Sequence, residues 1–158
     1  MEKQVYELPS TFDEFVDARK AGFMRVKEYK ENGGKFAGFL CSYTPNEILD
    51  AAGIASVGLC GTSNETVPVA EEDLPKNLCP LVKSTYGFAK SQKCPYTYFA
   101  DGVVEVVLQA CHTFNVEATP MGRMVEDMGV SYLKLETDYS TTDSGQIETR
   151  IAAFIEIL

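Results

Sequence analysis

The sequence predicts an α/β fold: a single lobe in which a mostly parallel sheet of about four strands is covered by helices. Two observations lead to this prediction. Segments with helical spacing of apolar residues alternate along the chain with short apolar segments of strand length, and those short segments carry few polar residues. This alternation is typical of parallel sheets that are covered on both faces. A chain of 158 residues can bury one core, so we expect one domain over residues 1–158.

Five segments have the apolar spacing and the boundary residues of helices. The first opens on a capping-box pattern of Thr11 and Glu14 and ends before Gly33. Prolines that directly follow Thr44 and Cys79 mark the starts of two others. The predicted helices are 11–30, 44–52, 79–87, 121–128 and 147–158, with one further turn after Cys94-Pro95.

The strands are predicted from short apolar runs between these helices. The run 103–108 (VVEVVL) has the highest content of β-branched residues and is the clearest of them. Small polar residues and prolines indicate loops over 60–76 and 138–145. The predicted strands are 35–41, 54–59, 103–108 and 130–135.

Charge and hydropathy exclude several classes of partner. The net charge of −9 and the lack of a Lys/Arg cluster argue against nucleic acid and anionic membranes, because phosphate binding depends on basic side chains. The most apolar stretch, 102–110, is interrupted by Glu105 and Gln109 and falls short of the roughly 20 residues of a membrane span. The first ten residues, MEKQVYELPS, lack the apolar core of a signal peptide, so we expect a cytoplasmic protein.

The five cysteines are Cys41, Cys60, Cys79, Cys94 and Cys111. An odd number in a chain expected to be cytoplasmic argues against a disulfide framework. No C-x-x-C motif occurs, which excludes the zinc ribbon, the thioredoxin motif and the bacterial ferredoxin run. Any site that the cysteines share must therefore be assembled by the fold from separate loops.

Three of the cysteines are predicted to lie at one edge of the sheet. Cys41 ends one strand, Cys111 lies three residues past the end of another, and Cys79 stands at a helix start. Loops at the carboxyl ends of parallel strands and the helix N-termini that follow them form the usual ligand crevice and favour anionic groups. Thiolates without nearby histidines indicate zinc or an iron–sulfur cluster, which the spacing does not separate. The alternative is that the three are small buried hydrophobic residues.

Longer motifs around these cysteines resemble one family. The motifs are 38–53 (GFLCSYTPNEILDAAG), 77–84 (NLCPLVKS) and 107–115 (VLQACHTFN), together with the ending 136–156. They resemble the D-component family of 2-hydroxyacyl-CoA dehydratases, which also contains benzoyl-CoA reductase subunits and double-cubane cluster proteins. The double-cubane branch is the most similar.

The resemblance implies a cofactor and partners. It implies an iron–sulfur cluster of the [4Fe-4S] type, double-cubane in full-length members, held by Cys41, Cys79 and Cys111. It also implies low-potential, anaerobic electron transfer from an ATP-dependent iron–sulfur activator to a small molecule or an acyl-CoA thioester at an open cluster iron. The remaining cysteines, Cys60 and Cys94, are either further ligands or structural thiols.

Two other residues beside the predicted edge, His112 and Glu47, are candidates for proton transfer. His112 adjoins Cys111, and an imidazole exchanges protons near neutral pH, so His112 is the candidate catalytic residue. A loop histidine bonded to the backbone is the alternative. Glu47 is an acid near the predicted edge, but its helix-capping position gives it a structural role instead of a catalytic one.

The chain also departs from the family pattern in one respect. Family members resemble two Rossmann-like lobes in a longer chain. Here residues 1–101, which resemble the N-terminal lobe, continue directly into residues 102–158, which resemble the C-terminal segment. We expect a one-lobe hybrid or a deletion product, in which the strand that ends at Cys111 replaces the equivalent strand of the first lobe. Its exposed apolar surface favours a homodimer. Because one lobe cannot build a cleft between lobes, a non-catalytic cluster-binding or metal-free scaffold is the alternative function.

Overall fold

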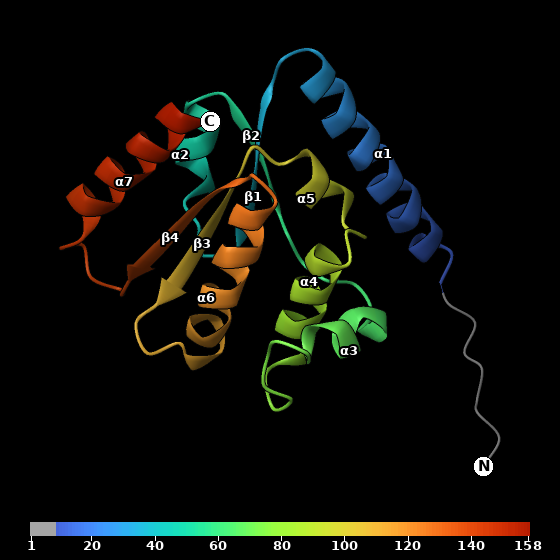
Figure 1. Ribbon diagram of the computed structural model, residues 1–158. Helices are drawn as coiled ribbons and strands as arrows, with labels where there is room; N and C mark the ends of the chain where they lie inside the picture. Colours follow the sequence, from blue (N-terminus) through green and yellow to red (C-terminus); the bar gives the residue numbers. More distant parts are fainter. Residues whose placement is uncertain (1–8) are drawn as a thin grey trace.

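Four strands form the centre of the protein in a computed structural model that describes residues 9–158 (Figure 1). Residues 1–8, most of the stretch from which a cytoplasmic location is expected, lie outside the described residues. The strands are β1 (Lys35–Leu40), β2 (Ile54–Gly58), β3 (Gly102–Leu108) and β4 (Ser131–Thr137). The helices are α1 (Thr11–Glu31), α2 (Asn46–Ala51), α3 (Val67–Ala70), α4 (Pro80–Lys90), α5 (Pro95–Phe99), α6 (His112–Asp127) and α7 (Ser144–Ile157), with a 3-10 turn η1 (Asn64–Thr66) before α3.

The sheet is parallel throughout, in the order β2-β1-β3-β4. Leu40 at the end of β1 pairs with Glu105 of β3, and Leu108 at the end of β3 pairs with Thr137 at the end of β4. The carboxyl ends of β1, β3 and β4 therefore lie at one edge, which we call the carboxyl edge. The predicted α/β class, with a four-stranded parallel sheet covered by helices, is confirmed.

Each face of the sheet packs against its own helices. On one face Val103 joins Met121 and Val125 of α6 and Tyr86 of α4 in a core cluster. On the other face Val104 and Val106 pack against Leu135 and against residues of α7. Because side chains alternate along a strand and both faces of β3 are covered, almost every residue of β3 is buried. Burying each Val or Leu side chain contributes about 1.5–3 kcal/mol, so β3 is the centre of the core.

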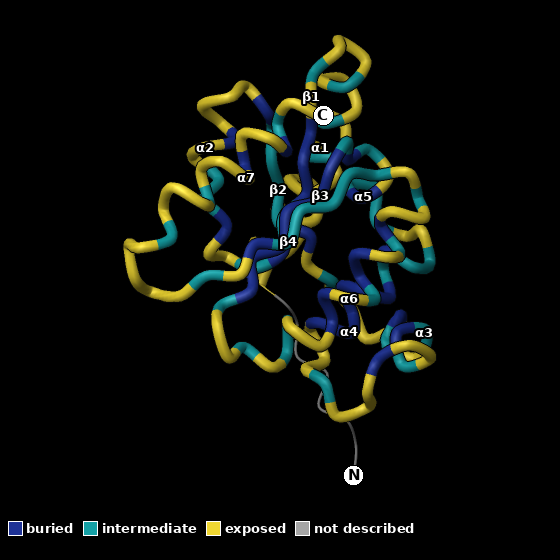
Figure 2. Tube along the Cα trace, turned by 60° about the vertical axis from the view of Figure 1, so that its left-hand side comes forward, coloured by how far each residue is buried: buried dark blue, intermediate teal, exposed yellow. Residues whose placement is uncertain are grey.

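Burial decreases outward from the sheet, as Figure 2 shows. Strands β1 and β3 and the inner faces of α4 and α6 are largely buried, and β2 and β4 are mostly half-buried. Helix α1, by contrast, has no buried residue and exposes Phe12, Phe15 and Met24. Over residues 9–158, no helix combines the length and the hydropathy that crossing a bilayer requires.

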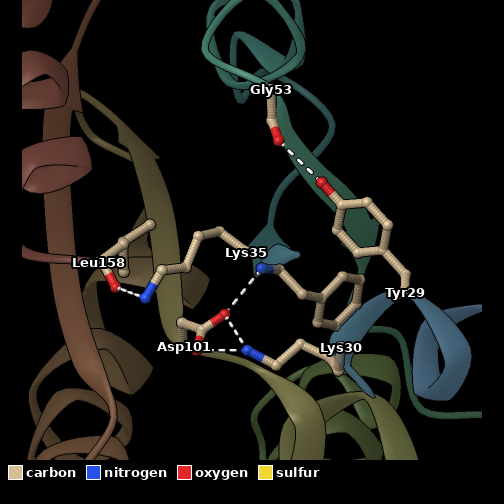
Figure 3. Close-up of polar contacts among 7 residues, drawn as sticks. Tyr29, Lys30, Lys35, Gly53, Asp101 and Leu158 are labelled. Atoms are coloured by element: carbon tan, nitrogen blue, oxygen red, sulfur yellow. Dashed lines mark hydrogen bonds and ion pairs between the residues drawn. The ribbon is translucent and has the colours of Figure 1, made fainter. Parts of the chain in front are cut away.

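Polar contacts tie the other elements to the amino-terminal edge of the sheet (Figure 3). Lys30 at the end of α1 donates to both carboxylate oxygens of Asp101 at 2.6 Å, and Asp101 also accepts the backbone N–H of Phe36 at 2.8 Å. Lys35 donates to the backbone carbonyl of Leu158, which joins β1 to the end of α7. This edge lies opposite the carboxyl edge, so these contacts brace the scaffold and leave the carboxyl edge free.

The structure corrects four predictions about element boundaries. Helix α1 starts from Ser10, without a side-chain cap, so the Thr11 capping box is wrong. Helix α6 begins at His112, nine residues before the predicted 121–128. The predicted loop 60–76 contains η1 and α3. Helix α4 continues past Gly87 to Lys90. This glycine allows a close approach of two backbones and does not end the helix: a Cβ there would lie 2.1 Å from the carbonyl oxygen of Thr66.

Candidate functional site at the carboxyl edge

Backbone geometry at the carboxyl edge is unusual beside two of the predicted cysteines. Cys41 directly follows β1 and has a positive φ of 76°, and Ala110, which precedes Cys111, has a φ of 67°. The left-handed region costs a residue with a Cβ roughly 1–2 kcal/mol, and such residues are found preferentially at functional sites. These two turns set the positions of Cys41 and Cys111 at the ends of neighbouring strands.

Thr44 holds the Cys41 turn in place. Its side chain is buried, and its hydroxyl lies 3.0 Å from the carbonyl oxygen of Cys41 and 3.2 Å from that of Leu40. The helix predicted to start at Thr44 begins two residues later, at Asn46, because the residue before α2 is Pro45 and no side-chain cap is present. Glu47 is exposed in the first turn of α2, so its expected capping role is also wrong.

Cys79 and Cys111 occupy the same position in their helices. Each is the residue directly before the first turn, Cys79 before α4 and Cys111 before α6, and neither makes a side-chain cap hydrogen bond. Both helices start at the carboxyl edge and run back along the same face of the sheet (Figure 1). Helix N-termini carry partial positive charge and free N–H groups, which favour anions.

Electrostatic effects connect the thiols to groups around the carboxyl edge. The pKa of Tyr139 is raised, chiefly by its hydrogen bond with Tyr43 and to a smaller extent by Cys41 and Cys111. Cys79 instead acts on Glu117 of α6. Cys41 packs against the apolar cluster on the α7 face, whereas Cys79 and Cys111 stand at the starts of α4 and α6 on the other face.

The arrangement of the cysteines bears on the two groups that the sequence indicates, a zinc ion and an iron–sulfur cluster. All five are free thiols. Within residues 9–158, no three His, Cys, Asp or Glu side chains form a group that could hold a metal ion. A [4Fe-4S] cluster binds each thiolate through a different iron, so its ligands spread over the cluster instead of gathering around one ion. Thiols at Cys41, Cys79 and Cys111 have the chemistry of cluster ligands, and among the described residues they form no ready site for a single zinc ion.

The other predicted residues have different surroundings. His112 is exposed in the first turn of α6. Cys94 packs against the apolar core, and Cys60 and Cys94 line the same apolar cavity, whose volume of about 10 Å³ is at or below what one water requires. These surroundings favour a structural role for Cys94. Cys60 is exposed at the mouth of the same region.

Two fully buried glutamates lie beneath the carboxyl edge and were not predicted as functional. Glu105 of β3 is 0% exposed and accepts a hydrogen bond from the hydroxyl of Tyr132 of β4. Glu117 of α6 is 1% exposed. One carboxylate oxygen of Glu105 and both of Glu117 are buried without a hydrogen-bond partner among the described residues.

Burial of these carboxyls has a clear electrostatic consequence. Loss of hydration raises the pKa of Glu105 to about 7, against a smaller opposing effect of Tyr132. Loss of hydration raises the pKa of Glu117 to about 9, and the nearby Glu105 raises it further. Glu117 therefore keeps its proton at neutral pH. The signal in the sequence was the single charge within the run VVEVVL, which was noted only as an interruption of an apolar stretch.

Comparison with known proteins identifies the family. The family described as 2-hydroxyglutaryl-CoA dehydratase, D-component, matches residues 41–100 and 96–158. The chain belongs to this family. The matched ranges include Cys41, Cys79, Cys111 and His112. The family matches as two separate ranges, which overlap at residues 96–100.

A curated relative gives the scale of the full-length family. The chain is 54% identical over 100 residues to "Putative dehydratase subunit YjiM" of Escherichia coli (strain K12). The alignment covers 63% of this chain and 26% of YjiM. The matched part of the chain thus spans about a quarter of the length of YjiM.

Proposed function

We propose that this chain is an iron–sulfur lobe of a D-component dehydratase, in which Cys41, Cys79 and Cys111 hold the cluster. One observation carries the proposal: three free thiols, from three separate segments, stand at the same edge of one parallel sheet in a chain of this family. Ligands of open α/β sheets bind at this edge. When bound, such a cluster would supply low-potential electrons and an iron corner open to a reducible group.

The chain's own residues have distinct roles in this proposal. Cys79 and Cys111 present their thiols at the N-termini of α4 and α6, where the helix dipoles stabilise negative charge. Cys41 is fixed by its left-handed turn and by Thr44. His112, exposed beside Cys111, would donate a proton to the group being reduced.

The family supports the remaining parts of the proposal. We propose that electrons arrive from an ATP-dependent iron–sulfur activator and pass to a small molecule or an acyl-CoA thioester, in an anaerobic cytoplasm. The domain proposal is one lobe over residues 1–158, with a junction near residue 101. The junction is supported by the two family matches, which meet at residues 96–100.

A non-catalytic scaffold is the second candidate function. The observation that favours it is that the four strands of residues 9–158 form one parallel sheet and so one lobe. If the substrate cleft lies between two lobes, one lobe would hold a cluster without turnover, unless a second copy supplies the missing wall.

The first experiment tests the ligands. Protein purified without oxygen is assayed for iron and acid-labile sulfide and for visible absorption, as wild type, Cys79→Ser and Cys94→Ser. We expect bound iron to fall strongly in Cys79→Ser and to be retained in Cys94→Ser, whose side chain packs against the apolar core. Wild-type protein without iron, or equal iron in both variants, would contradict the assignment.

The second experiment separates an enzyme from a scaffold. Turnover is measured with an ATP-dependent activator and a reductant, for wild type and His112→Asn. An enzyme with His112 as proton donor should lose turnover in the variant while keeping its iron. Cluster-loaded protein without any turnover supports the scaffold.

A further inference from the structure

A pocket opens at the carboxyl edge on the face covered by α7. It has a volume of about 240 Å³. Its apolar lining comes from three elements: Val106 and Leu108 of β3, Leu135 of β4 and Ile147 of α7. Val106 and Leu135 are fully buried, so they form the floor, and the pocket lies at the carboxyl ends of the neighbouring strands β3 and β4.

Two tyrosines stand at the rim of this pocket. Tyr43 follows β1 and Tyr139 follows β4, and both line the pocket although they are largely exposed. Their rings pack edge to face at 5.9 Å between centroids, and their hydroxyl oxygens lie 3.3 Å apart. Because Cys41 packs against the apolar cluster that contains Val106 and Leu135, the pocket is adjacent to one of the proposed cluster ligands.

The charge at the rim selects against anions. Asp138 lines the pocket, and its pKa is lowered by hydrogen bonds from the side chain and backbone of Ser140, so it is a carboxylate at neutral pH. No lysine, arginine or histidine occurs among the described residues that line the pocket. A negatively charged group would therefore lose its hydration and meet a like charge without a compensating partner.

We propose that this pocket binds a small, uncharged, apolar group of the substrate and rejects a group that ends in a carboxylate. The inference rests on the proposed function only in assigning the group to a substrate; the binding preference stands on the pocket itself. At roughly 30 Å³ for each water-sized unit, the pocket holds about eight non-hydrogen atoms. The preference differs from the one that the glutaryl group in the family's description implies, since that group ends in a carboxylate.

Pentanamide and glutaramate are suitable probes because they share a five-carbon chain and differ in a terminal methyl or carboxylate group. Each is titrated into the full chain, and the methyl signals of leucine, isoleucine and valine are followed by NMR. We expect saturable shifts for Leu135 and Ile147 with pentanamide, and binding at least about tenfold weaker for glutaramate, because the carboxylate must be desolvated.

Two variants link the binding to the pocket. Ile147→Phe fills the space and should abolish the shifts, whereas Ile157→Phe, at an exposed position on the same helix, should keep them. Asp138→Asn changes only an exposed side chain and should reduce the difference in binding affinity between pentanamide and glutaramate. Absence of pentanamide binding, equal binding of both probes to wild type, or an unchanged preference in Asp138→Asn would overturn the proposal.

The result is independent of the cluster assay. If wild-type protein binds no iron but shows the preference for pentanamide, the proposed function fails and the pocket remains. If iron is bound through Cys79 and pentanamide causes no shifts, the pocket assignment fails and the proposed function remains.

Discussion

Replacing Glu117 with glutamine should change how the stability of the protein depends on pH. Glu117 is 1% exposed, and neither of its carboxylate oxygens has a partner among the described residues. In the unfolded chain its pKa returns to the ordinary value of 4.5, whereas burial raises it to about 9 in the fold. Glutamine has nearly the same shape and stays neutral in both states, so it removes the titration alone.

The sign follows from proton binding. Between pH 4.5 and 9 the folded protein holds a proton on Glu117 that the unfolded chain has lost, so the free energy of unfolding falls as pH rises. The stabilisation is complete below pH 4.5 and lost as pH passes 9. One proton corresponds to about 1.4 kcal/mol per pH unit, so Glu117 lowers stability by about 3 kcal/mol between pH 4.5 and 7. That is a large part of the roughly 5–15 kcal/mol that a domain has.

Glu105 adds a second proton over a narrower range. Its pKa of about 7 makes its contribution fall between pH 4.5 and 7, by about 3 kcal/mol, and stay constant above. The carboxyls whose pKa values are lowered, Glu71, Asp73 and Asp138, destabilise the fold only on acidification below about pH 5. The range from pH 5 to 9 therefore reports mainly on the buried pair.

Urea unfolding at half-unit steps from pH 5 to 9 is the measurement. The wild type should lose stability with a two-proton slope up to pH 7 and a one-proton slope above it. Glu117→Gln should show a one-proton slope up to pH 7 and little change above. Glu126→Gln, at an exposed position near the end of the same helix, should keep the wild-type profile. A wild type that becomes more stable from pH 5 to 9, or a Glu117→Gln profile with the wild-type slopes, would refute the reasoning.

Two further substitutions test the scaffold by urea unfolding at neutral pH. Asp101→Asn removes the charge that pairs with Lys30 at 2.6 Å and should cost about 1–3 kcal/mol, whereas Asp17→Asn, in an exposed ion pair, should change stability by less than about 0.5 kcal/mol. Gly87→Ala places a Cβ 2.1 Å from a backbone oxygen and should cost about 1–3 kcal/mol or more, whereas Gly145→Ala, which meets open space in α7, should be neutral or stabilising. Equal effects of a variant and its control would show that the contact has no special role.

The sequence predicted the order of the elements because each leaves a local pattern. Strand β3 was evident from VVEVVL, and Gly53 and Gly129, both with positive φ, marked the ends of α2 and α6 as expected. The first turns of α6 were missed, because His112 to Pro120 mixes polar and apolar residues and contains a proline that usually ends a helix. Packing against β4 and α4 keeps that segment helical.

The candidate site, like the fold, was predictable from the sequence in part and depended on tertiary packing for the rest. Cys41, Cys79 and Cys111 could be placed at one edge from the sequence, since the ends of parallel strands and the starts of the following helices share an edge. The protonated Glu117, by contrast, depends on loss of hydration, which arises only when α6 packs over β3.

The amino-acid order by itself thus determined the class of fold, the family and the thiols at the carboxyl edge, because those depend on spacing along the chain. Tertiary structure alone decided that Cys41 packs against the apolar cluster on the α7 face, and that Tyr43 and Tyr139 meet at the rim of a pocket. These are contacts between residues far apart in the chain. Their distances and their hydration are set by the packing of helices on the sheet, which leaves no mark in any single segment.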